Sequence, residues 1–151
     1  MNSSWLLLVH AAATLFMTGL IWFVQVVHYP LFSAVGSAES PAYARAHQRL
    51  TTSVVGPVML VEAACAVLLL VPTLSGGAAP DGRALVWFGA ALLAAIWLST
   101  ALLQIPAHAR LLDGYDPAVG RGLVDGNWIR TACWSARSVI ALLLVRQSMS
   151  G

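Results

Sequence analysis

QIPAHARLLDG (104–114) and DGNWIRTACWSAR (125–137) are the stretches that decide the fold, because one apolar segment ends in the first and another begins in the second. Between Gln104 and Arg137 the chain carries one histidine, three aspartates and four arginines, inside or beside sequence that is apolar enough to lie in lipid. Ionisable groups are costly in a bilayer and usually face the interior of a helix bundle. The stretch therefore predicts a polar site within a membrane protein.

The composition of the whole chain agrees with a membrane protein. Of the 151 residues, 59% are hydrophobic and only 9% are charged, whereas roughly a quarter of the residues of a soluble domain are charged. The net charge of +2 is small and scattered, so nucleic acid is not an expected partner. The first apolar run lacks a basic start and exceeds a signal peptide's hydrophobic region, so we expect it to be retained. Cys65 and Cys133 lie in apolar segments without a metal or redox motif, and we expect unpaired packing thiols.

Four apolar segments are long enough to cross a bilayer, which takes about 20 residues. The expected helices cover residues 5–28, 41–72, 84–112 and 123–147. The predicted fold is an all-α integral membrane four-helix bundle of up-and-down topology, in a single domain over residues 1–151. Arginines are more frequent on the side of the two longer connections, 29–48 and 108–126. The positive-inside rule therefore places these connections in the cytoplasm.

Two charged residues are expected inside the membrane at similar depth. Glu62 lies about 13 residues beyond Arg49, where the apolar part of the second helix begins, and Arg137 lies about 14 residues into the fourth helix, which at a common helical rise brings them level. The sequence predicts an ion pair or a water-bridged pair between them, because a buried charge needs a partner. For Glu62, structural pairing alone and a role in proton transfer, ligand contact or metal binding are both open. The candidate catalytic residues are Glu62, Arg130 and Arg137.

Three histidines from three different helices are predicted to meet at one membrane face. His28 ends the first helix before a Tyr-Pro pair, His47 stands where the second helix enters the membrane, and His108 ends the third. Imidazole is the commonest protein ligand of transition metals, and helix bundles build such sites between facing helices. The set predicts an iron or copper site, or haem if His10 takes part. The alternative is three boundary histidines held by hydrogen bonds.

The same membrane face offers side chains for a polar ligand group. Asn127, Arg130, Trp134 and Arg137 follow one another at helical spacing and so share a stripe of the fourth helix. Arginine holds a carboxylate, or a quinone or phenol oxygen, through charge-assisted hydrogen bonds, and tryptophan supplies a flat wall for a ring. The expected substrate-binding residues are Asn127, Trp134, Gln104, Tyr43 and Arg49. The alternative is that Arg130 reaches to lipid headgroups.

Two parts of the sequence resemble families of membrane oxidoreductases. The last third resembles the small four-helix anthrone-oxygenase-like proteins, with a tryptophan, Trp128, directly after the asparagine. The residues that match are Pro106, His108, Leu111, Asn127, Arg130 and Thr131. The first helix is similar to that of the membrane-integral bacterial protoporphyrinogen oxidases, in which a first-helix histidine is implicated in haem binding. The residues that match are His10, Gly19, Trp22 and His28.

These resemblances imply a small oxidoreductase of the bacterial inner membrane. We expect a histidine-bound metal or haem and a hydrophobic, oxygen-bearing substrate that is aromatic or quinone-like. The alternative is a non-enzymatic accessory subunit that binds lipid or a partner. The expected partners are membrane lipid and a hydrophobic small molecule, with assembly into a homo-oligomer or a larger membrane complex.

Overall fold

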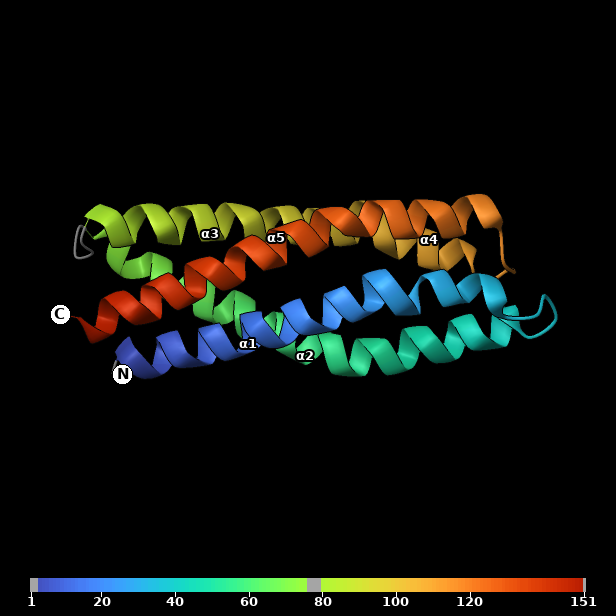
Figure 1. The fold of residues 1–151 in the computed structure, drawn as a ribbon, viewed down its shortest axis with the longest axis horizontal. Helices are drawn as coiled ribbons and strands as arrows, with labels where there is room; N and C mark the ends of the chain where they lie inside the picture. Colours follow the sequence, from blue (N-terminus) through green and yellow to red (C-terminus); the bar gives the residue numbers. More distant parts are fainter. Residues whose placement is uncertain (1–2, 76–79, 151) are drawn as a thin grey trace.

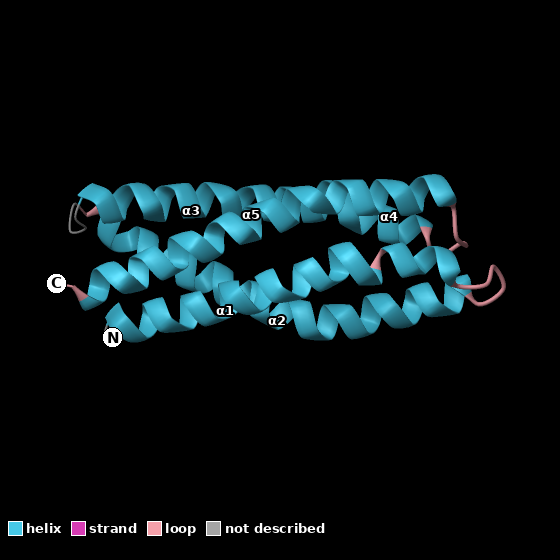
Figure 2. Cartoon of the chain, viewed as in Figure 1, coloured by secondary structure: helices cyan, strands magenta, loops and turns pink. Residues whose placement is uncertain are grey.

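The computed structural model describes residues 3–75 and 80–150, which form four long antiparallel helical spans (Figure 1). Each span is long and apolar enough to cross a membrane. The four spans are Trp5–Ala34, Ser40–Leu74, Gly82–Arg110 and Pro117–Met149. Only helices, turns and loops occur in these residues, without a strand (Figure 2). The predicted all-α four-helix membrane bundle is thereby confirmed.

Two of the spans are built from several helical elements. The first span contains the α-helix α1 (Ser3–Phe23), the π-helical turn η1 (Val24–His28) and the 3-10 turn η2 (Pro30–Ala34). The third contains α3 (Pro80–Ser99), the π-helical turn η3 (Thr100–Gln104) and the short helix α4 (Ile105–Arg110). The second and fourth spans are single helices, α2 (Ser40–Leu74) and α5 (Pro117–Met149).

Each π-helical turn is followed, after one intervening residue, by a proline. The amide of Tyr29 donates to the carbonyl of Val24 at 2.9 Å, and the amide of Ile105 donates to the carbonyl of Thr100, five residues back in both cases. The proline that follows has no amide hydrogen, and its ring would clash with the carbonyl four residues before it in a regular α-helix. The turn before the proline therefore widens.

The connections between the spans are shorter than predicted. The first span does not stop at the Tyr-Pro pair but continues to Ala34, so its connection to α2 shrinks to residues 35–39. The fourth span begins at Pro117 instead of residue 123, because Asp116 caps it: the Asp116 carboxylate accepts a hydrogen bond from the Ala118 amide at 2.7 Å. An N-cap aspartate followed by proline is a favoured helix start.

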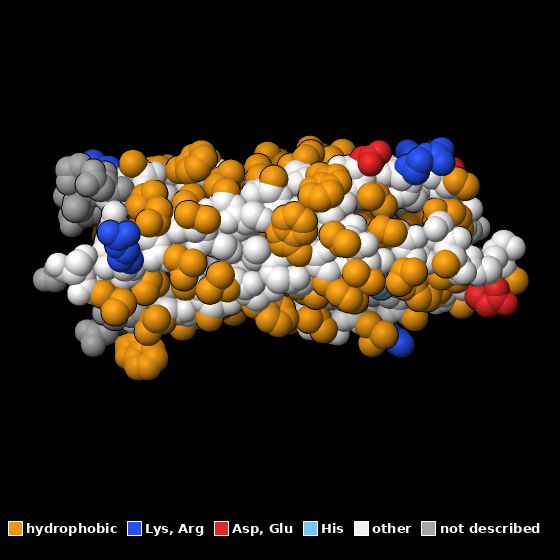
Figure 3. All heavy atoms as spheres, viewed as in Figure 1, with side chains coloured by type: hydrophobic (Ala, Val, Ile, Leu, Met, Phe, Trp, Pro, Cys, Tyr) orange, Lys and Arg blue, Asp and Glu red, His pale blue; other side chains and the backbone are white. Residues whose placement is uncertain are grey.

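Helix α5 packs against α1 and α3 along the bundle (Figure 1). The predicted stripe on this helix is confirmed, since its four members are buried: Asn127, Arg130, Trp134 and Arg137. On the face drawn in Figure 3, the side chains over the middle of the bundle are mostly hydrophobic, and the charged side chains lie nearer its ends. With its polar residues inside and its apolar residues outside, the chain is an integral membrane protein.

Candidate functional site

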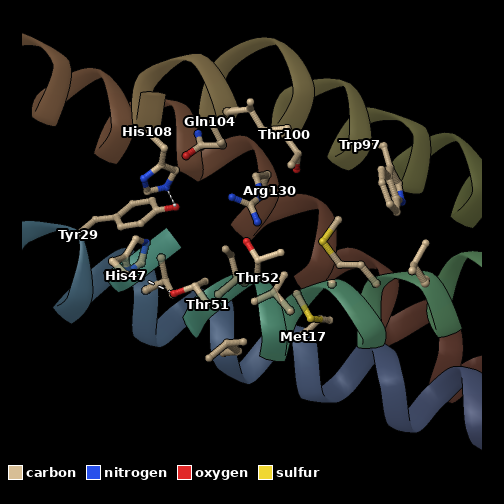
Figure 4. Close-up of a pocket in the computed structure, with 18 residues that line it drawn as sticks. Met17, Tyr29, His47, Thr51, Thr52, Trp97, Thr100, Gln104, His108 and Arg130 are labelled. Atoms are coloured by element: carbon tan, nitrogen blue, oxygen red, sulfur yellow. Dashed lines mark hydrogen bonds between the residues drawn. The ribbon is translucent and has the colours of Figure 1, made fainter. Parts of the chain in front are cut away.

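A cavity of about 340 Å³ is lined by the first three spans and by Arg130 of α5, in the half of the bundle that holds both π-helical turns (Figure 4). Leu60 of α2 and Trp97 and Ile105 of the third span form part of its wall and are also exposed on the outer surface. The cavity therefore opens sideways, toward the position of the lipid. Its walls are mostly apolar, and its polar side chains gather toward one end (Figure 4): Tyr29, His47, Thr51, Thr52, Thr100, Gln104, His108 and Arg130.

Arg130 is the charged residue of the cavity wall and is only 6% exposed. Its Nη1 donates to Oδ1 of Asn127 at 3.3 Å, and its guanidinium carbon lies 5.2 Å from the centre of the Trp134 ring. Its Nε has no hydrogen-bond partner among the described residues. The ion pair found in the described part of the chain joins Arg137 to Glu62, so Arg130 has no carboxylate partner there. A buried cation at the cavity wall is thus left without a counter-charge.

Gln104 is the second unsatisfied polar group at the cavity. The side chain is 2% exposed, and neither its Oε1 nor its Nε2 has a hydrogen-bond partner among the described residues. Leaving a buried donor or acceptor unpaired costs about 1–3 kcal/mol. Figure 4 shows Gln104 beside His108 and above Arg130, so its amide and the guanidinium belong to one polar end of the cavity.

The three histidines meet at this end, as the sequence predicts. His28 Nε2 and His47 Nδ1 lie 2.7 Å apart in a hydrogen bond, and the Thr51 hydroxyl lies 3.2 Å from the same His47 nitrogen. The His108 ring stacks near His47 with 5.1 Å between ring centres, and its Nε2 is hydrogen-bonded to the Tyr29 hydroxyl at 3.1 Å. The arrangement is a hydrogen-bonded cluster of imidazoles and a phenol.

This cluster does not fit the expected iron or copper site. Shared ligation places each nitrogen about 2.0–2.1 Å from a common metal ion, whereas His28 and His47 point a ring nitrogen at each other and His108 points one at Tyr29. No group of three or more His, Cys, Asp or Glu side chains in the described chain is placed to hold a metal ion. The expected haem ligand His10 is also elsewhere, since it lines a separate, small cavity of about 10 Å³.

Glu62 forms the predicted ion pair with Arg137 in the bundle interior. The Nε of Arg137 donates to Oε1 of Glu62 at 2.9 Å, and both side chains are buried. Thr14 donates to the same carboxylate oxygen at 2.9 Å, and the Trp134 indole donates to the other at 3.0 Å. Nη2 of Arg137 lies 3.2 Å from His10 Nε2, which accepts the bond because arginine is only a donor. Both charges are therefore satisfied within the protein.

The other predicted ligand-binding residues divide by position. Gln104 and Arg130 line the cavity, whereas Asn127 and Trp134 lie behind Arg130 and hold its guanidinium. Two more lie outside the cavity wall: Tyr43, which packs against the Phe32 ring, and Arg49, which is exposed.

Two further residues contribute to the site beyond those predicted from the sequence. The first is Tyr29, which bonds to His108 in the cavity wall. The second is Gln25, whose Oε1 accepts a hydrogen bond from Asn127 at 2.8 Å. The sequence signal for both is Pro30, because Tyr29 directly precedes it and Gln25 lies in the π-helical turn η1 that forms before it.

The arrangement suits a hydrophobic molecule with a polar oxygen. Its apolar body would fill the cavity from the side of the lipid, and its oxygen would reach Arg130 and Gln104. Tyr29, His47 and His108 are acid–base groups at the same end. Compared with known proteins, the chain matches no protein-family model, no curated protein and no solved structure.

Proposed function

We propose that the protein binds a hydrophobic, oxygen-bearing molecule, aromatic or quinone-like, and acts on it as a membrane oxidoreductase. The observation that supports binding is the buried Arg130 guanidinium, which belongs to the cavity wall and forms no ion pair within the described residues. A ligand oxygen could accept a hydrogen bond from this guanidinium, and a rotation of the buried Gln104 side chain, also part of the wall, would let its amide bond to the same oxygen. The redox class of the reaction rests on the sequence resemblance to anthrone-oxygenase-like proteins.

The dimensions and chemistry of the cavity support a flat ring system. Small-molecule sites usually have volumes of about 300–1,000 Å³ and apolar walls with a few placed polar groups, and this cavity of about 340 Å³ agrees. Trp97 provides an aromatic wall toward the lipid side. Tyr29 and His108, already joined by a hydrogen bond, can exchange a proton with the ligand oxygen.

Binding and turnover can be tested on the purified protein in lipid nanodiscs. A 2-methyl-3-alkyl-1,4-naphthoquinone and its quinol serve as probes, with quenching of tryptophan fluorescence as the binding signal, because Trp97 lies in the wall. Saturable quenching that weakens in Gln104→Leu supports the site. Conversion of the quinol under air, faster than without protein, supports the oxidoreductase. Binding without conversion favours the accessory or lipid-binding subunit, and no saturable binding contradicts the proposal.

The proposed location is a bacterial inner membrane, and the connections 35–39 and 111–116 are proposed to lie in the cytoplasm. The larger number of arginines at this end supports the orientation, under the positive-inside rule. The cavity then opens to the half of the bilayer nearer the cytoplasm. Assembly into a homo-oligomer or a larger membrane complex stays a prediction.

A further inference from the structure

We infer that the cavity holds its ligand as an oxyanion, whose negative charge balances the buried charge of Arg130. The ligand in question is an acidic phenol or hydroxyquinone that loses its hydroxyl proton on binding. This inference rests on the proposed function, because it concerns the charge of the molecule bound in the same cavity.

The two buried arginines of α5 differ in whether a carboxylate of the described chain pairs with them. Arg137 is 1% exposed and has the Glu62 carboxylate at 2.9 Å. Arg130 is 6% exposed, and no carboxylate of the described residues forms an ion pair with it. Arginine stays protonated in proteins, and a buried cation without a partner is strongly destabilising. Because no described carboxylate pairs with Arg130, a bound anion could supply the missing counter-charge.

The groups that surround Arg130 stabilise its charge only in part. Asn127 offers one amide oxygen at 3.3 Å, the Trp134 ring offers its face at 5.2 Å, and the Tyr29 hydroxyl is a further polar neighbour. The titratable side chains of the cavity wall are Tyr29, His47 and His108, and none of them is a carboxylate. The Arg130 guanidinium and the Gln104 side chain, which both belong to the cavity wall, supply the donors at this end. The polar end of the cavity thus presents one fixed positive charge and several donors to an acceptor oxygen.

Two histidines can accept the hydroxyl proton of the ligand and pass it to the surface of the bundle. The acid reaches the cavity from the lipid in its neutral form, the O–H bond breaks, and the electron pair stays on the oxygen beside Arg130. His47 lines the cavity and can take the proton. Its Nδ1 is joined at 2.7 Å to Nε2 of His28, which lines a different groove on the surface together with Leu50 and Val54. The two imidazoles therefore connect the cavity with the outside of the bundle.

A matched pair of ligands tests the charge directly. The acid is a 2-hydroxy-3-alkyl-1,4-naphthoquinone, and the control is its 2-methoxy ether, which cannot ionise. We expect the acid to bind the wild-type protein between about tenfold and about a hundredfold more tightly than the ether, as for a hydrogen bond to a charged group. The bound acid should show the visible spectrum of its anion even at a pH where the free compound is mostly protonated.

Two arginine variants link the preference to the site. Arg130→Gln should bind the acid and the ether with similar affinity, whereas Arg121→Gln, an exposed arginine of the same helix, should keep the preference. The wild-type comparison decides the question if Arg130→Gln does not fold. Equal binding of acid and ether, or a neutral spectrum of the bound acid, overturns the inference and leaves the proposed function standing. If neither compound binds, the proposed function fails as well.

Discussion

The buried polar residues of this protein are of two kinds, distinguished by where their partners lie. Glu62 is surrounded by donors from three other residues of the chain, and its carboxylate is fully hydrogen-bonded. Gln104 and the Nε of Arg130 have no partner in the described chain and lie at the cavity. Satisfied groups stabilise the bundle, whereas unsatisfied groups raise its free energy unless something binds. The second kind marks the site.

Losing one member of the Glu62–Arg137 pair should destabilise the bundle more than losing both. Replacing Glu62 alone by leucine leaves a buried arginine without its counter-charge, and we expect a loss of about 3–5 kcal/mol in the free energy of unfolding. Replacing both residues by leucine should restore most of that loss. Unfolding in mixed detergent micelles measures all three proteins. A double variant that folds and retains activity would also exclude a catalytic role for the pair.

The Gln104 amide should matter for the ligand and not for the fold. Because neither polar atom has a partner within residues 3–75 and 80–150, Gln104→Leu should leave stability unchanged or raise it, while ligand affinity falls by about twofold to tenfold. Ser99→Ala is the matched control, because Ser99 is also buried, its hydroxyl has no partner in those ranges, and it does not line the cavity. Titration of the quinone against both variants and thermal unfolding give the answer. Lower stability with unchanged binding in Gln104→Leu would contradict this role for the amide.

At the scale of the elements, the two π-helical turns position the side chains of the candidate site. Gln25 and His28 lie in η1, and Thr100 and Gln104 lie in η3. A π-helical turn adds a residue to the helix and rotates the helical segment after it relative to the segment before it, and such turns are frequent at functional sites. In the first and third spans, the segment after the π-helical turn is therefore rotated relative to the segment before it.

Removing one residue from η3 should abolish binding without unfolding the span. Leu102 lies in this turn with 68% of its surface exposed, so its deletion removes little buried contact. The turn should close to an α-helical turn and rotate the residues on one side of it by about 100°. We expect the helical content from circular dichroism to be preserved and quinone binding to be lost. Leu102→Ala, which keeps the residue count, should bind as the wild type does.

The sequence is sufficient for features that depend on counting residues along regular helices. The four spans, the stripe on α5 and the Glu62–Arg137 pair all follow from hydropathy and helical rise, and the structure confirms them. The sequence alone is insufficient where a helix departs from regular α-helical geometry. The widened turns before the prolines have no separate hydropathy signal, so the sequence does not single out Tyr29, and it assigns Arg49 to the site although that side chain is exposed.

At the scale of the whole molecule, the bundle is polarised along its length. The cavity, the histidine cluster and the short connections 35–39 and 111–116 lie in one half, and the two chain ends lie at the other (Figure 1). The satisfied charges of Glu62 and Arg137 lie in the interior, outside the cavity wall. The polar chemistry is therefore concentrated near one membrane face.

The orientation of this polarity can be determined by thiol labelling. In a background with Cys65→Ala and Cys133→Ala, a cysteine at Ser37 reports the end with the short connections, and one at Ser150 reports the other end. In intact bacterial cells, we expect a membrane-impermeant maleimide to label position 150 and to reach position 37 only after the membrane is opened. The opposite pattern would reverse the proposed orientation.

The sideways opening of the cavity determines which concentration controls its occupancy. A molecule that reaches the site from within the bilayer equilibrates with the protein according to its mole fraction among lipids, not its amount in the surrounding buffer. Diluting a sample with empty liposomes at constant total ligand should therefore empty the site, although the aqueous volume hardly changes. Poorly water-soluble compounds would occupy the cavity at very low overall abundance, because the membrane itself concentrates them.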